Sequence, residues 1–231
     1  MTQPSNDGDQ PGSTADAAKD LLAANDMTED RLAAILAEAG FEAELAGFDP
    51  EIVGTGQVGE NVRCHLRWAG AEAEATTAAG AAGQAPGQGS GQEPPATVIL
   101  KLPSSDPVSR ATGGATRSYI REVGFYRDVA NQVAIRVPAA HHVWEDQATN
   151  RFLLVMEDIN PAATGDQLAG GTLDQAGLAV DAAAALHGSS WDRTDLAELD
   201  WVDSPDPARA GERAELFAAL YPGVVDRYRA R

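Results

Sequence analysis

The stretch Val98-Ile99-Leu100-Lys101 decides the fold that we expect, because three apolar residues in a row lead directly to a lysine. A short apolar run of this kind is typical of a buried strand. The 231 residues contain fifteen arginines but only two lysines, Lys19 and Lys101, and Lys19 falls in a polar leader. An ammonium is a compact point charge, whereas the guanidinium of arginine is a planar fork. We therefore expect a chemical role for Lys101; an ordinary solvent-facing lysine at a strand end is the alternative.

Composition limits the classes of function. The formal net charge is −18 and 43% of the residues are hydrophobic, enough to bury a core in one large domain or two small ones. The acidic balance argues against binding of nucleic acid and against docking on anionic lipid. A single cysteine, Cys64, and four scattered histidines give neither a disulfide framework nor a zinc-ligand spacing. No signal peptide and no membrane-spanning stretch are found in the sequence, so we expect a cytoplasmic protein.

Two segments are predicted to be disordered. Residues 1–24 are polar and acidic, and residues 69–96 consist almost entirely of Ala, Gly, Gln and Pro. The second segment would be an insertion between two strands. A helix is expected from Thr28, which can cap its start, to about Gly40, which can end it. Its apolar face would consist of Leu32, Ile35, Leu36 and Ala39.

Hydropathy patterns predict five strands and three further helical segments. The strands are expected at residues 41–48 with 52–53, 62–68, 97–102, 139–145 and 152–156. The helices are expected at residues 116–132, at 174–188 and from 209 onward. Residues 104–114 are expected to form a polar loop.

Three glycines precede the second strand in the pattern Gly54-x-Gly56-x-x-Gly59. A dinucleotide-binding fingerprint requires a helix directly after the glycines. Residues 62–68 alternate like a strand instead, so we expect a turn between two strands. In kinases a loop of this kind places backbone N–H groups over nucleotide phosphates; a plain hairpin turn is the alternative. No P-loop pattern occurs in the chain.

Lys101 lies on the strand that follows this loop, and Glu122 comes 21 residues later on the next predicted helix. The order of glycine loop, strand lysine and helix glutamate is that of the ion pair that positions phosphates in kinases. A carboxylate next to an ammonium fixes its direction and keeps it charged. The sequence therefore predicts an ion pair between these two side chains.

In the glycine loop, Lys101 and Glu122, the chain resembles the aminoglycoside phosphotransferase and choline-kinase-like superfamily, in particular its ecdysteroid-kinase-like bacterial members. Further support comes from Arg121–Tyr126, Leu153–Ile159, Gly165-Asp166-Gln167, Gly170-Gly171 and Ala185–Trp191. The resemblance spans about residues 41–195. It implies an α+β fold in which residues 25–159 form a protein-kinase-like N-lobe, a five-stranded antiparallel sheet plus one helix. Residues 160–231 would be a linker and the first helices of an incomplete helical C-lobe.

The resemblance also implies a reaction, transfer of the γ-phosphoryl group of ATP, with Mg²⁺, to a hydroxyl of a small molecule that the sequence does not identify. The implied nucleotide-binding residues are Gly54, Gly56, Gly59, Lys101, Glu122, Met156, Glu157 and Ile159. The glycines and the lysine would hold the phosphates, Glu122 would orient the lysine, and the last three would form a hinge that offers backbone groups to adenine. Capping of the following turn by Asp158 or Glu157 is the alternative there. Asp166 is expected to be structural, His187 to be a packing histidine, and Trp191 to lie in the core.

The catalytic loop of this family, His-x-Asp-x-x-x-x-Asn, and its metal-binding aspartate have no counterpart in the 231 residues. His187-Gly188-Ser189 has serine where the loop needs aspartate, and Asp200-Trp201 precedes any such loop. Without these groups roughly several kcal/mol of barrier lowering would be missing, so we expect the chain to be inactive alone. We favour a fragment of a kinase. The alternative is a non-catalytic nucleotide-binding or interaction protein that self-associates through the uncovered C-lobe side.

Overall fold

The computed structural model of the chain describes residues 26–54, 56, 58–70, 93–162, 165–166, 168–203 and 207–229. The chain divides into two compact units, Met1–Trp191 and Asp192–Arg231. The predicted leader, residues 1–24, lies outside the described residues, as do residues 71–92 of the predicted insertion. The second described end of that insertion, residues 93–96, adjoins β2, since Trp68 Nε1 donates to the Pro95 carbonyl (2.8 Å) and the Leu66 N–H donates to the Ala96 carbonyl (2.8 Å).

Five strands form one antiparallel sheet in the order β1-β2-β3-β5-β4, which confirms the predicted α+β class and its five-stranded antiparallel sheet. The strands are β1 (Leu45–Val53), β2 (Gly59–Trp68), β3 (Thr97–Pro103), β4 (Ala140–Asp146) and β5 (Arg151–Glu157). The predicted break between residues 48 and 52 is wrong, because β1 runs through Pro50. Proline lacks an N–H for the ladder but is tolerated on an edge strand, and β1 is an edge of this sheet.

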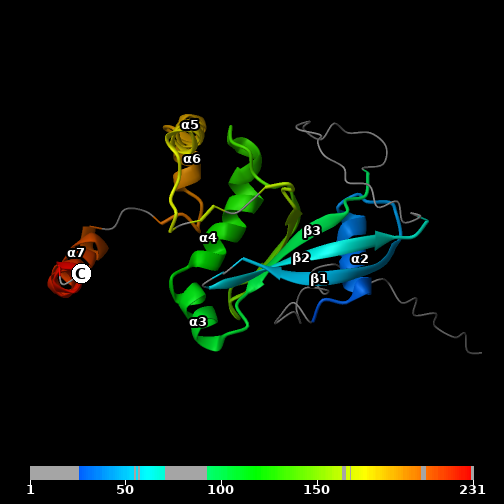
Figure 1. Cartoon of the computed structure of the whole chain (residues 1–231), viewed down its shortest axis with the longest axis horizontal. Coiled ribbons are helices and arrows are strands. Elements are labelled where there is room, and N and C mark those ends of the chain that lie inside the picture. Colours follow the sequence, from blue (N-terminus) through cyan, green and yellow to red (C-terminus); the bar gives the residue numbers. More distant parts are fainter. Residues whose placement is uncertain are drawn as a thin grey trace, which may run out of the picture. The chain divides into compact units, whose positions relative to one another are not determined.

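Helices pack on both faces of the sheet. Helix α2 (Glu29–Glu38) covers one face, and α3 (Pro107–Ala115) and α4 (Ser118–Gly124) pack on the other. In Figure 1, α3 and α4 lie by the end of the sheet at which β1 ends and β2 begins, and α2 lies toward the other end. The core under α2 consists of Met27, Leu32, Ile35, Leu36, Phe41, Val62, Cys64, Val98, Leu100, Leu102, Leu153 and Val155. The smaller core under α4 consists of Tyr119, Val123, Phe152, Leu154 and Met156.

Helix α2 forms where the sequence predicts it. The Thr28 side chain accepts a hydrogen bond from the Arg31 N–H (3.3 Å) and so caps the first turn. Gly40 follows the helix with φ +95°, a conformation that glycine adopts without steric cost. Leu32, Ile35 and Leu36 are buried against the sheet, as their spacing predicts.

The segment between β3 and β4 differs from the prediction. Residues 104–114 are not a polar loop, because α3 begins at Pro107 with Asp106 as its cap (2.7 Å from the Ser109 N–H). The helix expected at residues 116–132 is α4 followed by a π-helical turn at Phe125–Val129 and a 3₁₀ turn at Ala130–Gln132. Arg117, with φ 58°, separates α3 from α4. Two helices therefore pack on this side of the sheet, not one.

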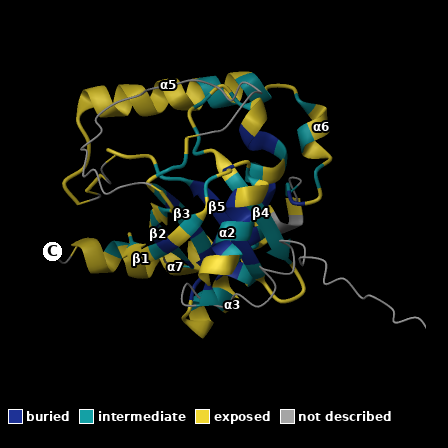
Figure 2. Cartoon of the chain, turned by 90° about the vertical axis from the view of Figure 1, so that its right-hand side faces the viewer, coloured by how far each residue is buried: buried dark blue, intermediate teal, exposed yellow. Residues whose placement is uncertain are grey.

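Three helices follow the sheet, namely α5 (Leu173–Ser190), α6 (Thr194–Ala197) and α7 (Pro207–Arg229). Thr172 and Gln175 form a capping box at the start of α5. No residue of α5 is buried, and Figure 2 shows the helix exposed along most of its length. No helix in the described part of the chain is long and apolar enough to cross a membrane.

Two histidines of β4 make the stability depend on pH. Burial lowers the pKa of both His141 and His142. The negative charge of Glu157 raises the pKa of His141, and that of Glu38 raises the pKa of His142, but both effects are smaller than that of burial. Among the described residues, the buried Nε2 of His142 has no hydrogen-bond partner. Near pH 6.5 the unfolded chain therefore binds more protons than the folded one, so this part of the stability is present above about pH 6.5 and is lost below it. We expect the urea midpoint to fall between about pH 7.5 and about pH 5.5.

The control for this pH dependence is a pair of matched variants. His142→Phe removes one of the two half-buried imidazoles and should weaken the dependence, to which His141 still contributes, whereas His187→Phe changes an exposed position on α5 and should leave it as in the parent. A parent midpoint that does not change over this pH range would contradict the assignment.

Candidate functional site

The structure brings Lys101 and Glu122 together. Val98, Leu100 and Leu102 of β3 face α2, so the alternate positions Ile99 and Lys101 face the opposite side. Lys101 Nζ lies 2.5 Å from Glu122 Oε1 on α4, and the two side chains are 25% and 31% exposed. The ion pair that the spacing predicts is thus present, and both of its side chains are partly buried.

The glycine-rich turn lies beside this pair. Gly54 has φ +76°, a conformation that disfavours any side chain. A Cβ on Gly56 would lie 1.9 Å from the Gly59 carbonyl oxygen. A Cβ on Gly59 would lie 3.1 Å from the Leu102 carbonyl oxygen and 3.9 Å from Lys101 Cε. The turn therefore needs glycine at Gly54 and Gly56, and Gly59 stands directly next to the lysine.

Two polar residues of β2 belong to the same face of the sheet, and the sequence analysis did not single them out. Asn61 lies opposite Lys101 and Arg63 lies opposite Ile99 in the β2–β3 register. The alternation of apolar and polar residues along β2 is the sequence signal that points to them. Val62 and Cys64 are fully buried under α2, so their neighbours must point to the other side.

Arg63 binds the carboxylate of Asp158 with both Nε (2.7 Å) and Nη2 (3.2 Å). The Asp158 side chain is only 4% exposed and that of Arg63 is 29% exposed. Burial alone would raise the pKa of Asp158, but hydrogen bonds from Arg63 and Thr97 and the charge of Arg63 hold it below its ordinary value. This carboxylate therefore ties β2 to the segment after β5, which is a different contact from the turn capping given as the alternative.

Glu157 is also engaged within the chain. Its carboxylate accepts from Arg136 and from the Ala139 N–H (3.0 Å), and its own N–H donates to the Ala139 carbonyl (2.8 Å). These contacts also differ from the turn capping given as the alternative, and the Glu157 N–H is not available to an adenine. Of the other predicted hinge residues, Met156 is buried under α4 and Ile159 is 39% exposed.

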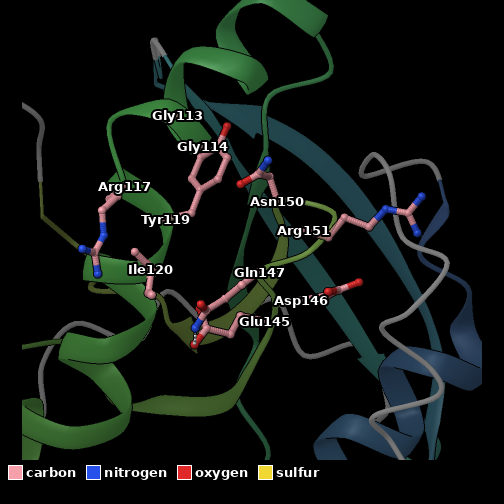
Figure 3. A pocket seen from close by; sticks show the side chains of 10 residues that line it. All are labelled: Gly113, Gly114, Arg117, Tyr119, Ile120, Glu145, Asp146, Gln147, Asn150 and Arg151. Carbon is pink, nitrogen blue, oxygen red and sulfur yellow. Dashed lines mark hydrogen bonds between the residues drawn. The ribbon is translucent and has the colours of Figure 1, made fainter. Parts of the chain in front are cut away.

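Two hollows of the described structure lie apart from the glycine-rich turn, Lys101 and Glu122. One, of about 230 Å³, is lined by the α3–α4 junction and the turn between β4 and β5 (Figure 3). The other, of about 400 Å³, is lined by residues such as Phe41, His141, Glu157 and Asp158. The glycines of the turn, Lys101 and Glu122 line neither of these two hollows.

The implied Mg²⁺ does not fit the residues that the structure describes. Among them, no three His, Cys, Asp or Glu side chains lie close enough to hold a metal ion. Glu122, the acidic residue nearest the lysine, is already bound to it.

Comparison with known proteins gives no match, whether with protein-family models, with curated proteins or with solved structures. The function must therefore be argued from the geometry of the site.

Proposed function

We propose that this chain provides the nucleotide-binding part of an ATP-dependent phosphotransferase that acts on a small-molecule hydroxyl. The observation that supports the proposal most is the 2.5 Å contact of Lys101 Nζ with Glu122, with Gly59 beside the lysine. A lysine ammonium has three donors, and Glu122 accepts one of them. The others can reach phosphate oxygens, with which charged hydrogen bonds are strong.

The order of elements supports a kinase-like N-lobe. A glycine-rich turn joins β1 to β2, the lysine lies on β3, and the glutamate lies on a helix between β3 and β4. This is the order in which protein kinases hold the phosphates of ATP. In the proposed complex the turn covers the phosphates with its backbone, and Lys101 neutralises part of their charge.

A second candidate function is a non-catalytic nucleotide-binding or interaction protein. It is favoured by the apolar residues exposed on α7, each of them 51–67% exposed. They are Leu216, Phe217, Leu220, Tyr221, Val224 and Tyr228. An apolar helix face of this kind is typical of an association surface. This candidate shares ATP binding with the first and differs from it in phosphoryl transfer.

Titration of the purified chain with ATP in a calorimeter tests the proposal. We expect saturable binding, and at least about tenfold weaker binding by Lys101→Ala, because the main phosphate donor is lost. The control is Arg67→Ala, which removes one positive charge from neighbouring β2 at a site paired with Asp49. It should bind ATP like the parent. Absence of binding by the parent, or equal binding by Lys101→Ala, would refute the proposal.

A phosphoryl-transfer assay can exclude the second candidate. With ATP, Mg²⁺ and a panel of small alcohols, we expect no transfer by the chain alone, because its sequence has no counterpart of the catalytic loop. Phosphorylation of any alcohol above background would overturn that expectation and exclude the non-catalytic candidate.

A further inference from the structure

One side chain joins the glycine-rich turn to the helix that holds Glu122. The Tyr119 hydroxyl, in the first turn of α4, donates to the carbonyl oxygen of Val58. The same carbonyl accepts from the Ser104 N–H (3.2 Å). Val58 directly precedes Gly59, the residue beside Lys101, and Tyr119 lies one helical turn before Glu122. A single hydrogen bond therefore connects the two parts that flank the lysine.

The Tyr119 ring is held on several sides. It is buried, and its centroid lies 4.8 Å from that of Phe152 on β5. On the α3 side it fills the space that Gly113 leaves open, since a Cβ there would come within 2.3–2.6 Å of three atoms of the tyrosine. Figure 3 shows the ring next to Gly113 and Gly114, with the Asn150 amide nearby. The ring cannot shift without moving α3 or α4.

The hydroxyl of Tyr119 remains a donor. Burial raises its pKa, more strongly than the Ser104 backbone and Arg110 lower it, so the group is protonated at neutral pH. The turn that it holds contains Gly54, Gly56 and Gly59. Glycine-rich backbone loses more conformational freedom on ordering than other sequences do. The hydrogen bond from Tyr119 to the Val58 carbonyl limits that freedom at the end of the turn nearest Lys101.

We propose that Tyr119 is a positioning residue that couples the glycine-rich turn to α4, so that the order of the turn and the position of Glu122 depend on each other. This inference rests on the proposed function insofar as nucleotide binding uses the coupling. A ligand that orders the turn then also favours the Lys101–Glu122 contact, and coupling of this kind is reciprocal.

Hydrogen exchange read by mass spectrometry tests the coupling in the full chain, first without nucleotide. Tyr119→Phe keeps the ring and removes the donor. We expect peptides that cover residues 54–59 and 118–124 to exchange about fivefold faster than in the parent, the factor expected when one hydrogen bond is lost. Peptides of α2 should be unchanged. Tyr126→Phe, which removes a hydroxyl one turn beyond Glu122, is the matched control and should leave the turn unchanged.

A second variant disturbs the ring from the other side. Gly113→Ala places a Cβ where the Tyr119 ring lies and should speed exchange of the turn while the hydroxyl is retained. Gly177→Ala, on exposed α5 with open space around it, is its control. Parent-like exchange of the turn in both Tyr119→Phe and Gly113→Ala would overturn the inference.

Addition of ATP provides the second arm. In the parent, ATP should slow hydrogen exchange in both the turn and α4. In Tyr119→Phe, ATP should slow hydrogen exchange in the turn but not to the same extent in α4. If ATP slows hydrogen exchange in α4 as much in Tyr119→Phe as in the parent, the proposed coupling is overturned. If the parent shows no ATP effect at all, the proposed function fails, and the nucleotide-free arm still decides whether Tyr119 links the turn to the helix.

Discussion

Replacement of Arg63 by methionine is expected to destabilise the folded chain by about 2 kcal/mol, because the buried carboxylate of Asp158 loses its partner. Removing one member of a buried pair leaves the other charge without compensation, and Asp158 is only 4% exposed. Because the Arg63 side chain is 29% exposed, we expect a smaller loss of stability than for a fully buried ion pair. Methionine keeps the length of the side chain, so the loss would come from the charge and its two hydrogen bonds. Urea unfolding at neutral pH measures the difference.

The same strand supplies the control. Arg67 pairs with Asp49, but these side chains are 54% and 72% exposed, and Arg67→Met should change stability by no more than about 0.5 kcal/mol. The pKa of Asp158 lies below its ordinary value in the folded chain, so the contribution of the pair is present at neutral pH and is lost as pH falls through that lowered pKa. The difference between Arg63→Met and the parent should therefore shrink in acid. Equal urea midpoints for Arg63→Met and Arg67→Met at neutral pH would contradict this account.

The second large effect concerns Gly56. A Cβ at this position would lie 1.9 Å from the Gly59 carbonyl oxygen, a contact that real structures do not contain. Gly56→Ala must therefore move the backbone of the turn and with it Gly59, which lies beside Lys101. If the turn holds phosphates, ATP binding should weaken at least about thirtyfold, or about 2 kcal/mol. Calorimetric titration of the variant with ATP measures this loss.

The fold of the Gly56→Ala variant should remain intact, because Gly56 is exposed and belongs to neither core. Gly177→Ala is the matched control, since a Cβ at that exposed position on α5 meets nothing within 4 Å. It should bind ATP like the parent and gain up to about 1 kcal/mol of stability from the helix propensity of alanine. A Gly56→Ala variant with parent-like affinity would show that the turn does not contact the nucleotide.

Much of the fold could be predicted because its patterns are local. A short apolar run placed Lys101 at the end of a strand, and a helical period placed Glu122 on the next helix. Helix α3 was missed although Asp106-Pro107 is a start signal for a helix, because the residues that follow lack an apolar period. The helix expected at residues 174–188 forms as α5, but none of its residues is buried, and the expected core position of Trp191 is wrong because its side chain is 80% exposed.

Part of the candidate site could not be predicted because its contacts join residues distant in the chain. Arg63 binds a carboxylate 95 residues away, and Tyr119 donates to a carbonyl 61 residues away. Neither pair leaves a periodic trace in the sequence, since each depends on how β2, the segment after β5 and α4 come together. For the same reason the sequence does not show that the Glu157 N–H, one of the backbone groups of the expected hinge, is already paired with Ala139.

The sequence by itself determined the five strands, helix α2 and the contact between Lys101 and Glu122. These depend on the two-residue repeat of a strand, the 3.6-residue repeat of a helix and caps such as Thr28. Only the tertiary structure decided that Arg63 is used to hold Asp158, that Tyr119 reaches the glycine-rich turn and that α3 supports the ring through Gly113. The physical reason is that a buried polar group must be paired, and the partner it finds depends on which elements pack beside it.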